Sequence, residues 1–211
     1  EALYSTPAGK NTIVIVLADH GDGMGSHRMV TKQVSFYEEM TNVPFIIAGP
    51  GIHPRQKPVE DLLTQPTIDL LPTLCELAGI PVPSSKPGIS LAPFLKGEKQ
   101  KRQHPYAASE WHSEYEVTVS PGRMIRSPRY KYTHYLEGNG EELYDMLKDK
   151  GERRNLAHDP KYSKILAEHR ALLDDYIRRT QDDYRSLKVE ADKRWRSHAP
   201  GYPNHEGPCA R

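Results

Sequence analysis

The chain has 211 residues, of which 29 are Lys or Arg and 28 are Asp or Glu, so its formal net charge is +1. This near-balance gives no bulk electrostatic reason to expect a nucleic acid or an acidic membrane surface as the partner. Hydrophobic residues make up 36% of the chain, which indicates either a polar tail or a surface that a partner segment covers. No apolar run reaches the length needed to span a membrane.

The first predicted element is the apolar run at residues 13–18, which ends in Asp19, His20 and Gly21. A strand without alternating polar positions is typical of a parallel sheet buried on both faces. Open α/β sheets bind their ligands beyond the carboxyl ends of the strands. We therefore expect the carboxylate and the imidazole to lie where they can hold a metal, while the glycine lets the backbone turn away.

A second strand is predicted at residues 43–48, followed by a helix. We expect Asp69 to cap this helix, with Pro72 in its first turn, and Gly79 to end it. Cys75 falls within the helix, where we expect it to fill apolar space. The proline- and glycine-rich residues 81–97 are predicted to form a loop.

The later part of the chain has the pattern of short strands followed by one long helix. Strands are predicted at residues 106–111, 123–126, 130–135 and 142–145, which favours an antiparallel sheet. Asp159 and Pro160 are typical of a helix start, and an apolar stripe from Ile165 to Ile177 is expected to cover one face of that sheet. The residues after 183 are polar.

The chemistry of the first segment depends on Asp19 and His20 together with two residues that follow them. Oxygen-rich sites favour calcium or magnesium, whereas several imidazoles favour zinc. A glycine-containing segment leads to Lys32, whose ammonium group could return to the metal and complete an anion site. At an effective dielectric constant of about 20, an ammonium group about 4 Å from an anionic oxygen gains roughly 4 kcal/mol of Coulomb energy before the cost of desolvation. Such a site suits hydrolysis of a sulfate or phosphate ester, and His27 could protonate the leaving oxygen.

Simpler interpretations of the same residues exist. The Asp-His-Gly sequence could be a capped turn, and Lys32 and His27 could be solvated surface groups. Glu38 and Glu39, which follow Lys32, suit a helix start or salt bridges better than catalysis.

The pattern resembles the type I sulfatase family, whose nucleophile is a formylglycine. The matching segments are residues 12–22, Gly25-Ser26-His27, Lys32, residues 35–39 and residues 43–47. Further segments match in order at residues 69–74, 78–81, 88–91, 124–126, 130–132, 142–145 and 155–157. No single segment is decisive, but their order and spacing from residue 11 to residue 184 are specific.

The resemblance implies an α/β fold of the alkaline phosphatase type, with part of a sheet-and-helix domain and a small antiparallel-sheet subdomain that carries a packed helix. We expect residues 1–100 to belong to the catalytic domain, 101–185 to form the C-terminal subdomain and 186–211 to form an extended polar tail. By the same resemblance, Asp19 and His20 coordinate one calcium ion. Lys32 would contact the sulfate near its bridging oxygen, and His27 would lie near the substrate.

Formylglycine is made from the first residue of a Cys/Ser-x-Pro-x-Arg motif, and neither Cys75 nor Cys209 lies in one. The paired aspartates that complete the family's calcium site are also missing from the sequence. We therefore expect the chain to be the C-terminal half of a sulfatase. Its partner would be the N-terminal half of the same protein, and the isolated segment would be inactive.

By the same resemblance, the end of the strand at 106–111 approaches the mouth of the active site, so residues for substrate choice are expected there. Glu110 and His112 could contact sugar hydroxyl groups, and Trp111 could stack on a ring or belong to the core. Arg123, with Arg126, could bind an anionic sugar or form an ordinary salt bridge.

The function that these observations favour is hydrolysis of a sulfate ester, with a sulfated carbohydrate as the expected substrate and a sulfated small molecule or glycan as the expected partner. The resemblance also implies a location outside the cytoplasm, in the periplasm, in a secreted form or in a lysosome. One alternative is a phosphoester or phosphonate hydrolase with two zinc ions, for which His104 or His112 could supply a further ligand. Another alternative is a non-catalytic binding module.

Overall fold

The computed structural model forms two units, which are described separately below. One contains residues 1–32 and 39–107, and the other contains residues 33–38 and 108–211. The described residues are 2–29, 35–55, 57–59, 62–85, 87–98, 104–112, 121–136 and 140–187.

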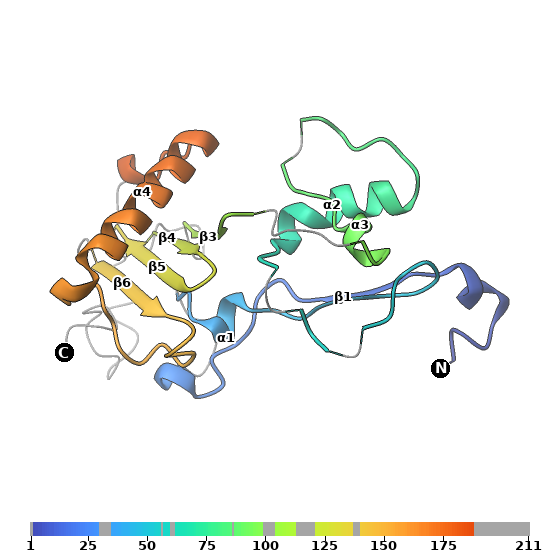
Figure 1. The fold of residues 1–211 in the computed structure, drawn as a ribbon, viewed down its shortest axis with the longest axis horizontal. Helices are drawn as coiled ribbons and strands as arrows, with labels where there is room; N and C mark the ends of the chain where they lie inside the picture. The colour runs from blue at the N-terminus through green and yellow to red at the C-terminus, as the bar shows by residue number, and fades with distance from the viewer. Residues whose placement is uncertain are drawn as a thin grey trace, which may run out of the picture. The chain divides into compact units, whose positions relative to one another are not determined.

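The first unit combines a pair of strands with short helices (Figure 1). Its elements are η1 (Pro7–Asn11), β1 (Val14–Leu17), η2 (Ser26–Arg28), most of α1 (Glu38–Thr41), β2 (Phe45–Ala48), α2 (Pro66–Leu77) and α3 (Ala92–Leu95). Both predicted strands are therefore present.

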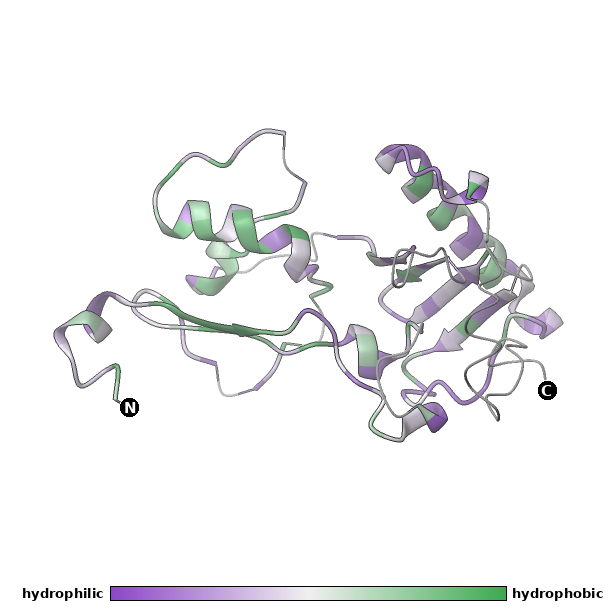
Figure 2. Ribbon diagram, turned by 180° about the vertical axis from the view of Figure 1, so that it is seen from behind, coloured by the Kyte–Doolittle hydropathy of each residue, from purple (hydrophilic) through white to green (hydrophobic). Residues whose placement is uncertain are grey.

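The pairing of β1 differs from the expectation. β1 runs antiparallel to β2, with Val14 opposite Ala48 and Leu17 opposite Phe45, and among the described residues no third strand joins them. Val16 is 49% exposed, so β1 is not buried on both faces. The apolar run predicts a strand correctly, but its composition does not encode the direction of the neighbouring strand or what covers its faces. Figure 2 shows hydrophobic residues along both strands.

Helix α2 begins earlier than predicted. Gln65 is its N-cap and Pro66 occupies its first turn, so Asp69 lies inside the helix instead of capping it. A proline at this position has a preset φ and lacks only an N–H that would have no partner within the helix. The end agrees with the prediction: Gly79 has φ +70°, and Cys75 is buried.

The second unit is built on a four-stranded sheet. Its elements are β3 (Ala107–Trp111), β4 (Gly122–Arg126), β5 (Tyr130–Tyr135), β6 (Gly140–Asp145), η4 (Pro160–Tyr162), α4 (Ser163–Thr180) and η5 (Tyr184–Ser186). The strand order is β3-β4-β5-β6, and both β4–β5 and β5–β6 are antiparallel. The predicted strands of this region are confirmed.

Helix α4 packs on the sheet against β4 and β5 (Figure 1). Leu166, His169 and Leu173 are its buried residues, and they belong to the predicted stripe. Asp159 acts as a cap as expected, because its side chain accepts a hydrogen bond from Lys161 N. That cap opens η4, a single turn that leads directly into α4.

The predicted division near residue 100 and the predicted tail stay predictions. Most of the tail, with Cys209, falls outside the described residues. Within the part of the chain that the structure describes, no helix has the length and apolar character needed to cross a membrane.

Candidate functional site

Asp19 and His20 follow β1 directly, and their side chains lie together. The carboxylate Oδ2 of Asp19 is 3.5 Å from Nε2 of His20. Nδ1 of His20 is 2.8 Å from the carbonyl oxygen of Gly21, which can only accept, so Nδ1 carries a proton. Asp19 also accepts a hydrogen bond from the backbone N–H of His20.

This geometry suits the binding of a cation. In the neutral ring, Nε2 presents a lone pair toward a carboxylate oxygen, and a divalent ion between them would satisfy both. The side chain of Asp19 is 86% exposed, so an ion can reach it. Two donors do not fill a calcium shell of six to eight oxygens. Within the described ranges, no group of three or more His, Cys, Asp or Glu side chains could hold a metal ion.

Gly21 connects this pair of residues to the backbone of α1. Its N–H donates to the carbonyl oxygen of Met40 at 3.0 Å. A Cβ atom at Gly21 would lie 1.8 Å from the carbonyl oxygen of Glu39, which is far inside contact distance. Close approach of two backbones is therefore what this position demands.

His27 lies in η2, with its backbone in the left-handed region at φ +49°. Its Nε2 is 3.9 Å from Oε2 of Glu39, and both side chains are partly buried. The first unit therefore brings Glu39 to His27 and, through its backbone, to Gly21. Lys32, the predicted sulfate ligand, lies outside the described residues.

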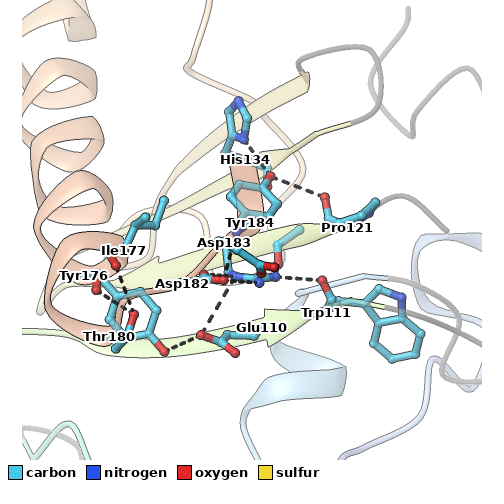
Figure 3. Close-up of polar contacts among 12 residues, drawn as sticks. Glu110, Trp111, Pro121, His134, Tyr176, Ile177, Thr180, Asp182, Asp183 and Tyr184 are labelled. Carbon is cyan, nitrogen blue, oxygen red and sulfur yellow. Dashed lines mark hydrogen bonds and ion pairs between the residues drawn. The ribbon is translucent and has the colours of Figure 1, made fainter. Parts of the chain in front are cut away.

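Glu110 and His112 lie at the end of β3 in the second unit, where both are exposed. The hydroxyl group of Tyr176, on α4, donates to Oε1 of Glu110 at 2.7 Å, as Figure 3 shows. Burial and this hydrogen bond raise the pKa of the Tyr176 phenol, so it remains a donor.

Arg123 is buried and engaged on every side. Its guanidinium forms a bidentate salt bridge with Asp182, in which Nε lies 2.6 Å from Oδ2 and Nη2 lies 2.9 Å from Oδ1. It also donates hydrogen bonds to the carbonyl oxygens of Trp111 and Gly122. It also stacks over the Tyr184 ring. The hydrogen bond from Arg123 lowers the pKa of the Asp182 carboxyl group. The salt-bridge interpretation of Arg123 thus matches its geometry, while a direct substrate contact stays a prediction.

His104, considered as a zinc ligand, points elsewhere in the first unit. Its Nε2 is 3.0 Å from Oδ1 of Asp69. The Asp69 side chain is fully buried, and its carboxylate also accepts hydrogen bonds from the N–H groups of Gln65 and Ile89.

The sequence did not predict Asp182 and Tyr176, two residues that contact the candidate substrate-binding residues. Their spacing from Arg123 and Glu110 in the sequence carries no signal, since the fold alone brings them together.

Comparison with known proteins places these residues in a family. The model of "N-sulphoglucosamine sulphohydrolase, C-terminal" matches residues 25–179. The chain belongs to this sulfatase family. The predicted family and fold class are thereby confirmed.

Individual sulfatases show how close the relation is. Over 211 residues the chain is 77% identical to delta 4,5-hexuronate-2-O-sulfatase of Bacteroides thetaiotaomicron, covering all of this chain and 44% of that protein. A solved 2-O GAG sulfatase superposes with a TM-score of 0.89 at 78% identity, covering 98% of this chain and 45% of the other.

A phosphonate monoester hydrolase from Silicibacter pomeroyi also shares the fold. It superposes with a TM-score of 0.71 at 27% identity, covering 88% of this chain and 38% of the other. The chain thus spans less than half the length of each of these relatives.

Proposed function

We propose that the complete protein containing this chain is a sulfuric ester hydrolase that removes a sulfate group from a sulfated carbohydrate. The single observation that carries the proposal is the 3.5 Å approach of Asp19 Oδ2 to His20 Nε2 at the end of β1. The family membership of the chain supports the choice of sulfate over other anions. By analogy with the 77% identical relative, the proposed substrate is a 4,5-unsaturated hexuronate that carries a 2-O-sulfate.

Asp19 and His20 would supply two ligands of a divalent cation, proposed to be calcium. When bound, that ion would offset the negative charge of the sulfate group. Lys32 is proposed to contact the sulfate near its bridging oxygen, and His27 to donate a hydrogen bond or a proton to the leaving oxygen. The remaining ligands and the formylglycine nucleophile would come from an N-terminal half of the same protein, so the isolated chain is expected to be inactive.

Glu110 and His112 are proposed as contacts for the sugar. Both are exposed at the end of β3, as such contacts require. Arg123 is proposed to assist by holding this region in place: its Nε lies 3.9 Å from Oε1 of Glu110, and its Nη1 donates to the carbonyl oxygen of Trp111.

The metal proposal is tested in the complete protein with Asp19→Asn and His20→Ala. Each is expected to lose bound calcium and to lower sulfate release by about 100-fold or more, because charge developing on the sulfate oxygens is no longer offset. The matched control is Asp22→Asn, which changes a nearby exposed carboxylate. Elemental analysis and sulfate release are the measurements. Wild-type calcium content and activity in both variants would contradict the proposal.

The second candidate is hydrolysis of phosphonate or phosphate esters, favoured by the shared fold of the phosphonate monoester hydrolase. The hydrogen bond between His104 Nε2 and the buried carboxylate of Asp69 argues against a zinc site at His104, because Asp69 already occupies that ring nitrogen. Turnover of a 2-O-sulfated unsaturated disaccharide and of a phenyl phosphonate ester decides between them. One calcium with preference for the sulfate supports the first candidate, and two zinc ions with preference for the phosphonate support the second.

The proposal includes a location outside the cytoplasm, which is supported by the family resemblance. Fractionation of the source cells, with sulfatase activity assayed in each fraction, tests it. Activity confined to the cytoplasmic fraction would contradict it.

A further inference from the structure

His27 is held in a strained turn. Met24, His27 and Arg28 all have positive φ values, between +47° and +62°, which cost L-residues free energy. Backbone hydrogen bonds close the turn, among them Gly25 N to Met29 O at 2.8 Å and Ser26 N to Gly23 O at 2.7 Å. The backbone of His27 is therefore specified by the loop around it.

The carboxylate of Glu39 lies close to the imidazole of His27. Oε2 of Glu39 lies 3.9 Å from Nε2, and the side chains are 31% and 18% exposed. When the imidazole is protonated, partial burial of both groups strengthens their attraction relative to a fully exposed pair.

The position of Glu39 is itself set by backbone contacts. Gly21 N donates to Met40 O, and a Cβ atom at Gly21 would lie only 1.8 Å from Glu39 O, so no side chain fits there. The adjacent carboxylate, Glu38, is engaged elsewhere, 2.7 Å from the ammonium group of Lys131. Of these two neighbouring acids, Glu39 is the one whose carboxylate lies close to His27.

We propose that Glu39 is a positioning residue for His27: its carboxylate holds the Nε2 edge of the imidazole, so that the ring keeps one orientation toward the sulfate ester. This inference rests on the proposed function, in which His27 acts at the leaving oxygen. Glu39 does not touch the substrate in this scheme. Its effect is exerted on the step that needs His27 and not on substrate binding.

The test compares Glu39→Ala, Glu39→Gln and His27→Gln in the complete protein. Glu39→Ala is expected to lower kcat by about 10- to 100-fold with KM changed less than about two-fold, because a misplaced group weakens the chemical step. Glu39→Gln, which keeps an acceptor oxygen, is expected to restore part of kcat. The imidazole nitrogen NMR signals of His27, assigned by their loss in His27→Gln, are expected to move in Glu39→Ala.

Glu76→Gln, an exposed change on α2, is the matched control and should leave kcat and the His27 signals unaltered. If Glu39→Ala keeps wild-type kcat and unmoved signals while His27→Gln is inactive, the inference is wrong and the proposed function stands. If His27→Gln is fully active, the proposed role of His27 fails and the inference fails with it. A fall in melting temperature without a change in kcat per folded molecule also overturns the inference.

Discussion

Gly21 shows at the scale of one residue why glycine follows the two proposed metal ligands. The sequence suggests a sharp turn, but the structure shows a close approach to the carbonyl oxygen of Glu39. Gly21→Ala is therefore expected to lower the free energy of unfolding by about 1–3 kcal/mol through overpacking. Chemical denaturation measures the change. Gly151→Ala, whose Cβ would meet only ordinary contacts, is the control, and equal effects of the two changes would contradict this explanation.

His169 is a buried histidine whose titration makes the stability of the protein depend on pH. Its Nε2 is 2.8 Å from Oγ of Ser127, its Nδ1 is 2.8 Å from Ile165 O, and burial lowers its pKa. The unfolded chain binds a proton near pH 6.5 and the folded chain only at lower pH. This contribution to stability is therefore full above about pH 6.5 and is lost as the pH falls toward the folded pKa.

Denaturation of the wild type and of His169→Gln at about pH 7.5 and 5.5 tests this linkage. The wild type is expected to lose more stability on acidification than the variant does. His158→Gln, at an exposed position, should behave like the wild type. A variant that loses as much stability as the wild type would show that His169 does not titrate in this way.

At the scale of elements, Asp69 joins α2 to the loop that follows it. Its buried carboxylate accepts from Gln65 N, Ile89 N and the His104 ring. Asp69→Ala leaves these donors without their acceptor and is expected to cost about 2–4 kcal/mol of unfolding free energy. Asp69→Asn, which keeps one acceptor oxygen, should cost less. A loss no greater than that of the exposed Glu76→Ala would refute this role.

The helices and sheet of the second unit could be predicted because their signals are local. The apolar stripe of α4 and the tyrosine-rich run of β5 are visible within single segments. The predicted start of α2 is wrong because Asp69 is a good cap by residue type, while its partners in the structure lie up to 35 residues away. The same limit applies to β1, whose antiparallel partner is a property of the fold.

Candidate site residues follow the same division between local and distant signals. Asp19 and His20 could be proposed from their adjacency after a strand. The engagement of Arg123 with Asp182 could not, because 59 residues separate the two. Only the fold shows that the guanidinium is buried against its partner.

At the scale of the whole molecule, Lys131 ties distant parts of the second unit together. It is 1% exposed, and its ammonium group lies 2.7 Å from Glu38, 2.9 Å from Glu152 and 2.9 Å from the carbonyl oxygen of Phe36. Burial raises the pKa of the Glu152 carboxyl group despite this ion pair. Residues 35–38 are thereby fixed to the sheet that begins some 70 residues later.

Lys131→Met is expected to lower the free energy of unfolding by about 3–5 kcal/mol, because it leaves a buried carboxylate without its cation. Adding Glu152→Gln to this variant should recover part of the loss, since the buried charge is then removed. Thermal and chemical denaturation of the complete protein provide the measurement. Lys148→Met, an exposed change, is the control. If Lys131→Met lost no more unfolding free energy than Lys148→Met, the Lys131 cluster would contribute little to stability.

Helix α1 is only four residues long, yet its first two residues serve different partners: Glu38 pairs with Lys131, and Glu39 with His27. Inserting one residue just before α1 would move Glu38 into the place of Glu39 and leave Lys131 without this acid. Deleting one would move Glu39 into the place of Glu38 and leave His27 without its acid. The spacing of this segment is therefore constrained more tightly than the identity of its exposed neighbours, and natural variation in chain length should be found elsewhere.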